Sequence, residues 1–114
     1  MSVQFMVFLG YTEELINVSI DSYNILNKNQ KSLLKALIKI STNNKVVSGV
    51  KELSNLIGVT NTTVSSALSV LEGNKIIQDI TRRGIIFTGC VINKSKIDEI
   101  ITYYQTKKTF LEKI

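Results

Sequence analysis

The segment from Gly49 to Asn74 constrains the fold of this chain more than any other part of its sequence. It reads GVKELSNLIGVTNTTVSSALSVLEGN, in which two runs with helical apolar spacing are separated at Gly58. Gly58 can take the left-handed backbone conformation that ends a helix, and Thr60 is a residue type that favours the start of the next one. The segment therefore predicts two short helices joined by a tight turn. The apolar residues of the second helix share one face: Val64, Ala67, Leu68 and Leu71.

The spacing of apolar residues around this segment predicts the other elements of a small α+β domain. Arg82-Arg83-Gly84 lies between two β-rich runs, which is the pattern of a hairpin with a short turn. Asn27 or Asn29 suits the start of the preceding helix, and Ser95 the start of the last one. In chain order we expect a helix over Gln30–Ser41, a short strand at Val46–Val47, strands over Ile76–Thr81 and Ile85–Ile92, and a helix from Ser95 to about Lys113.

The first twenty residues are predicted to form strands. Val3–Leu9 and Leu15–Ile20 are rich in β-favouring residues and are separated by a turn region. Asp21 or Ser22 can cap a short helix nearby that runs through Leu26. The apolar start of the chain has no basic n-region and is soon followed by two acidic residues. We therefore interpret it as a strand and not as a signal peptide or a membrane span.

The net charge of +5 is unevenly distributed along the 114 residues. Residues 1–30 hold one basic and three acidic side chains, whereas residues 31–114 hold thirteen basic and six acidic ones. A basic body suits a polyanionic partner such as nucleic acid, although a solvated lysine-rich surface would give the same balance. The length favours a single domain with a real hydrophobic core.

The chain has no His and a single cysteine, Cys90, which excludes several kinds of chemistry. A Cys/His metal cluster, an intrachain disulfide and imidazole acid–base catalysis are all ruled out. Cys90 lies in an apolar run, so we interpret it as a small buried hydrophobe and not as a nucleophile. We expect a protein without enzymatic activity, metal or cofactor, located in a reducing cytoplasm.

The order helix, short strand, helix, turn, helix, hairpin resembles the winged helix-turn-helix family of bacterial DNA-binding proteins. The resemblance covers about Gln30–Ile92 and implies one α+β domain over residues 1–114, with N-terminal strands within residues 3–20 and a long C-terminal helix over about residues 95–113. The chain is similar in this respect to small plasmid-encoded replication or transfer accessory proteins and to MarR-like regulators. The positions that carry the resemblance are Leu53, Ile57, Gly58, Val59, Val64, Leu68 and the run Thr63–Ile77.

The resemblance implies a DNA interface made by the second helix and the hairpin, or wing. Arg82 and Arg83, the only arginines in the chain, are expected at the wing tip, where they suit a narrow A·T-rich minor groove. The outward side chains of the second helix are small and uncharged, which suits hydrogen bonds to bases or phosphates, or docking against a protein. These are Asn61, Thr62, Ser65, Ser66 and Ser69. The lysines expected to contact phosphates are Lys75, Lys45 and Lys51.

The expected function is therefore non-enzymatic binding of double-stranded DNA, as an accessory factor of a plasmid or other mobile element in replication or conjugative transfer. The alternatives are a MarR-like transcriptional regulator and a winged-helix module that binds protein. The last helix has more apolar surface than the end of a small chain requires. It is expected either to fold back onto the helix at residues 30–41 or to pair with its copy in a homodimer, which we favour.

Overall fold

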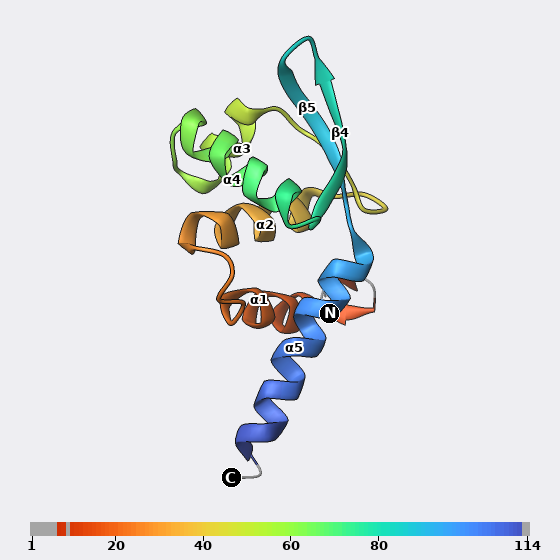
Figure 1. Ribbon diagram of the computed structural model, residues 1–114. Helices are drawn as coiled ribbons and strands as arrows, with labels where there is room; N and C mark the ends of the chain where they lie inside the picture. The colour runs from red at the N-terminus through yellow and green to blue at the C-terminus, as the bar shows by residue number, and fades with distance from the viewer. Residues whose placement is uncertain (1–6, 9, 113–114) are drawn as a thin grey trace, which may run out of the picture.

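The computed structural model describes residues 7–8 and 10–112, which form five helices and two antiparallel sheets (Figure 1). One hydrophobic core joins all five helices to the larger sheet, whose strand order is β3-β5-β4. The elements in chain order are β1 (Val7–Phe8), β2 (Tyr11–Thr12), α1 (Glu13–Asp21), α2 (Lys28–Ile40), β3 (Lys45–Val47), α3 (Val50–Ile57), α4 (Asn61–Gly73), β4 (Ile77–Arg83), β5 (Ile86–Ile92) and α5 (Lys94–Glu112).

Helices α3 and α4 form the predicted helix-turn-helix. Gly58 ends α3 with φ 71°, and its N–H donates to the carbonyl of Ser54 at 2.8 Å. The hydroxyl of Thr60 accepts a hydrogen bond from the N–H of Thr63 at 3.1 Å and so caps α4. Both capping predictions are confirmed. Helix α2 packs against α3 and α4. Of the two residues predicted to cap the start of α2, Asn27 and Asn29, Asn27 is the cap.

The wing is a long hairpin with a two-residue turn. Arg83 pairs with Ile86, so the turn consists of Gly84 and Ile85 only. Gly84 has φ 66°, the positive value that the first position of a type II′ turn requires. At Gly89 of β5 an added Cβ atom would lie 2.3 Å from a carbonyl oxygen of β3, so these strands can approach only because the residue is glycine. The predicted hairpin is confirmed, but its first strand continues through Arg82 and Arg83, and its turn is Gly84-Ile85 instead of Arg82-Arg83-Gly84.

The prediction of a strand over Leu15–Ile20 is wrong, because these residues lie in α1. The hydroxyl of Thr12 caps this helix by accepting a hydrogen bond from the N–H of Leu15 at 3.2 Å. Ile16 and Ile20, four residues apart, are both buried, which is the spacing of one helix face. Packing of this face against the core outweighs the β-propensity of the branched side chains. Of the strand predicted over Val3–Leu9, only Val7–Phe8 lies within the described strand; the remainder falls outside the described residues.

The short helix predicted from Asp21 or Ser22 through Leu26 is also absent from this described part of the chain. The N–H of Ser22 donates to the carbonyl of Val18 and ends α1, and turns follow as far as Leu26. Lys35 of α2 then binds the carboxylate of Asp21 at 2.5 Å, which ties the end of α1 to α2.

Helix α5 begins one residue earlier than predicted, and its cap is Asn93 rather than Ser95. The side-chain oxygen of Asn93 accepts a hydrogen bond from the N–H of Ser95 at 3.1 Å. The buried residues of α5 lie in its first half and pack against α1, not back onto α2 as one prediction had it: Ile97, Ile100 and Ile101. The second half runs past α1, away from the wing (Figure 1). Lys113, its predicted end, lies outside the described residues.

Two polar features complete the packing. The hydroxyl of Tyr11 donates to the carboxylate of Asp98, and this hydrogen bond raises the pKa of Tyr11. It joins the segment before α1 to the first turns of α5. Cys90 is buried in β5, and burial raises the pKa of its thiol to about 11. The thiol is therefore protonated at neutral pH, and the interpretation of Cys90 as a small buried hydrophobe is confirmed.

Candidate nucleic-acid interface

Helix α4 presents to solvent a polar face without basic side chains. Its apolar residues, spaced three and four apart, are buried against α2 and α3, so the opposite side must face outward. Among residues 61–71 no side chain carries a positive charge. The five predicted contact residues of this helix are all exposed: Asn61, Thr62, Ser65, Ser66 and Ser69.

A groove of about 370 Å³ separates α4 from the wing. Ser65 and Ser69 line it from the α4 side, and Arg82 lines it from β4. Three of the predicted contact residues, from two elements, therefore share one surface. The remaining lining is mostly apolar: Val50, Leu68, Ile80, Ile85, Ile86 and Phe87.

The groove also contains an acidic residue that sequence reasoning missed. Glu72 lies on α4, and its Oε1 atom is 4.0 Å from Nη2 of Arg82, with both side chains half exposed. The helical spacing from Ser65 to Ser69 to Glu72 was the available signal, because positions four and then three residues apart share a face. One of the two wing arginines thus faces a carboxylate.

Arg83 differs from Arg82 in its surroundings. It is exposed at the end of β4, directly before the turn. Among residues 7–8 and 10–112, no ion pair involves its guanidinium. Arg82 and Arg83 are therefore adjacent in sequence but differ in their charged surroundings, because only Arg82 faces a carboxylate.

The turn beside these arginines is apolar and exposed. Ile85 is 95% exposed and Ile86 62% exposed. Sequence reasoning assigned both to the start of a strand and attached no function to them. Figure 1 shows this turn at the far end of the hairpin, beyond α3 and α4.

The three predicted lysines do not gather around the groove. Lys51 lies in the first turn of α3, next to Val50 of the groove lining. Lys45 pairs with Val91 near the end of β5 that is remote from the turn. Lys75, with φ 61°, precedes β4 at the same end of the sheet. The seven-residue strands of the wing place Lys45 and Lys75 about 20 Å from its tip. Lys51 is the nearest of the three to the groove in sequence, but none of the three lines it.

Comparison with known proteins supports the fold and no closer relationship. No protein-family model matches the chain, and no curated protein matches it. Within the described residues, no helix is long and apolar enough to cross a membrane. A solved structure called "Possible transcriptional regulator from Methanosarcina mazei Go1" is similar, with 16% identity and a TM-score of 0.55, over 98% of this chain and 94% of that chain. The likeness extends over nearly the whole of both chains, and with the element order described above it shows an α+β winged-helix fold.

Proposed function

We propose that this protein binds double-stranded DNA without enzymatic activity, gripping it through the wing and reading it with α4. The observation that carries the proposal is the groove in which Ser65 and Ser69 of α4 face Arg82 of the wing. A recognition helix in the major groove and a wing against the adjacent backbone or minor groove would use the two walls of this surface together.

The two walls of the groove, α4 and the wing, differ in the interactions that they can make with DNA. Hydroxyl and amide groups on α4 can bond to base edges or phosphates, but they supply no charge. The guanidinium groups of Arg82 and Arg83 supply the charge, and arginine is favoured in a narrow A·T-rich minor groove. We therefore propose that the wing provides most of the affinity, with Lys51 as a phosphate contact beside the groove.

The biological role that we propose is that of an accessory factor of a plasmid or other mobile element, bound at a replication or transfer origin. A recognition helix without basic side chains and a wing with two arginines support a wing-led grip of this kind. The second candidate is transcriptional regulation, which the name of the similar solved structure favours. Binding-site selection on random duplexes, followed by mapping of the site beside its gene, would separate these roles.

We also propose a homodimer formed through the exposed surface of α5. Tyr103, Phe110 and Leu111 are exposed large hydrophobic side chains on this helix. A surface of α5 carries Asp98 and Glu99 at one end and Lys107 at the other. An antiparallel copy of the same helix would bring each lysine beside the acidic pair of its partner, which makes the surface self-complementary.

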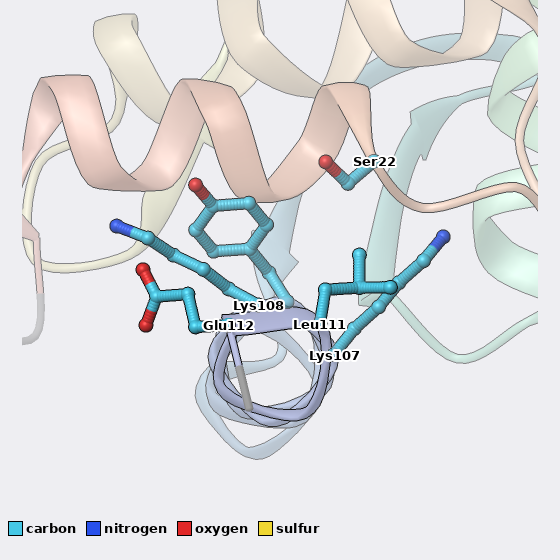
Figure 2. Close-up of a pocket in the computed structure, with 6 residues that line it drawn as sticks. Ser22, Lys107, Lys108, Leu111 and Glu112 are labelled. Atoms are coloured by element: carbon cyan, nitrogen blue, oxygen red, sulfur yellow. The ribbon is translucent and has the colours of Figure 1, made fainter. Parts of the chain in front are cut away.

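The other side of α5 carries a second apolar surface, which faces the end of α1. A cavity of about 320 Å³ lies between this part of α5 and the end of α1. Figure 2 shows Leu111 facing Ser22 across it, with Lys107 and Lys108 extending to opposite sides. The cavity leaves part of the apolar surface of α5 without an intramolecular contact.

Fluorescence anisotropy with A·T-rich and G·C-rich duplexes at several salt concentrations tests DNA binding and the wing-led grip. We expect the double change Arg82→Ala and Arg83→Ala to lower affinity by about tenfold or more and the salt slope by about 2. The matched control removes two exposed charges from α2, Lys28→Ala and Lys39→Ala, and should have little effect. An unchanged salt slope in the arginine variant would overturn the wing-led grip. Failure of the unaltered protein to retain duplex at moderate salt would overturn DNA binding and favour a protein-binding module.

A further inference from the structure

The wing tip carries an apolar side chain where turn chemistry favours a polar one. The second position of a two-residue hairpin turn is typically Asn, Asp, Ser or Gly. Ile85 occupies it with 95% of its surface exposed, so it gains no packing within the chain. A local rule broken without a compensating contact is typical of a functional position.

Cationic and apolar side chains lie close together at this tip. Arg83 immediately precedes the turn and pairs across the hairpin with Ile86, while Arg82 pairs with Phe87. The exposed isoleucines thus follow the two arginines in the chain, and Arg83 lies directly opposite Ile86. This combination matches the minor groove of DNA, where phosphates and base acceptors attract arginine and the stacked bases accept an apolar wedge.

Directly behind the tip, one side chain is buried and a hydrogen bond between side chains joins the two strands. Phe87 is buried at the base of the tip, and the hydroxyls of Thr81 and Thr88 lie 3.1 Å apart across the strands. Paired strands of other DNA-binding proteins enter the major or minor groove, and deformation of the duplex can widen a groove. A two-residue turn ends in very few side chains, so it suits such an entry.

We infer that Ile85 is a wedge residue that inserts between base pairs from the minor groove and kinks the bound duplex. The inference rests on the proposed DNA binding and adds to it a deformation of the DNA. Isoleucine is among the side chains that unstack a base step in this way, with kinks of about 20–90°. Pyrimidine–purine steps, which deform most easily, would be the preferred point of insertion, so the wedge would also contribute sequence preference.

The test measures bending and binding in the same samples. A duplex of about 30 base pairs with a central TA step carries a donor and an acceptor dye at its ends. Energy transfer reports the end-to-end distance, and anisotropy reports affinity. We expect the unaltered protein to shorten the distance, and Ile85→Ser to abolish the shortening. Affinity should change by less than about tenfold. The variant loses the favourable contact of Ile85 with the bases, but it also no longer has to unstack them, and these two free-energy changes oppose each other.

Two matched variants make the outcome specific. Ile85→Met keeps an apolar wedge and should retain the bend. Val47→Ser changes another exposed β-branched residue, 87% exposed on β3, and should also leave the bend unchanged. Binding by the unaltered protein without shortening, or equal shortening by Ile85→Ser, would overturn the wedge and leave DNA binding intact. Loss of self-association in Ile85→Ser with no change on DNA would overturn it in favour of a protein contact. Absence of any duplex binding would instead overturn the proposed function.

Discussion

At the scale of single residues, Glu72 opposes the proposed role of Arg82 in binding DNA. Its carboxylate lies 4.0 Å from the guanidinium of Arg82, inside the groove that would face DNA. Both groups are half exposed, so water screens their attraction and the pair adds little to stability. Its effect on a polyanionic partner is larger, because the carboxylate repels phosphates and partly neutralises the arginine.

The change Glu72→Gln is therefore expected to strengthen duplex binding by up to about fivefold, since exposed ion pairs of this kind are worth about 0.2–1 kcal/mol. Anisotropy titrations at low and moderate salt measure the change, which should shrink as salt rises. Glu112→Gln removes the same charge from the far end of α5 and serves as the control. Equal affinities of Glu72→Gln and the unaltered protein would show that the pair does not restrain Arg82 at the DNA.

At the scale of elements, the sequence was sufficient wherever one short segment determines its own structure. The caps at Gly58 and Thr60, the apolar face of α4 and the turn at Gly84 all follow from local rules, and all are present. Helix α1 was missed because its β-branched residues favour a strand locally and become helical through distant packing. The groove contact between Glu72 and Arg82 depends on how the wing folds over α4, which no local pattern specifies.

The turn between α3 and α4 allows a test of whether its left-handed backbone requires glycine at position 58. No atom would clash with an added Cβ, so the cost of Gly58→Ala comes only from the left-handed backbone and should be about 1–2 kcal/mol of unfolding free energy. Gly73 has equally open surroundings but lies in α4 without a positive φ. Gly73→Ala should leave stability unchanged or raise it by up to about 1 kcal/mol. Urea unfolding followed by circular dichroism measures both, and a Gly58→Ala variant as stable as Gly73→Ala would contradict the left-handed cap.

At the scale of the whole molecule, the proposed DNA-binding and self-association surfaces lie at opposite ends. The principal extents are 51, 37 and 25 Å, with the wing at one end of Figure 1 and the end of α5 at the other. Substitutions on α5 can therefore change assembly without touching the groove. This separation allows each proposal to be tested by variants that spare the other.

The homodimer is tested by exchanging charges along α5. In the antiparallel arrangement Lys107 of one copy meets Glu99 of the other, so Lys107→Glu or Glu99→Lys alone places like charges together. Each single variant should weaken the dimer by about fivefold or more, and the double variant should restore it, because the exchanged pair attracts again. Sedimentation equilibrium measures whether the mass is 12.7 kDa or twice that value.

Rescue by the double variant separates a specific pairing from a general effect of charge. Lys39→Glu on α2 makes the same change in charge as Lys107→Glu and should leave the dimer intact. Single variants that dissociate should still bind duplex through one wing, but more weakly, since the second contact no longer acts at high effective concentration. Two additive single effects without rescue would rule out the antiparallel pairing. A single-chain mass for the unaltered protein at tens of micromolar would rule out the dimer itself.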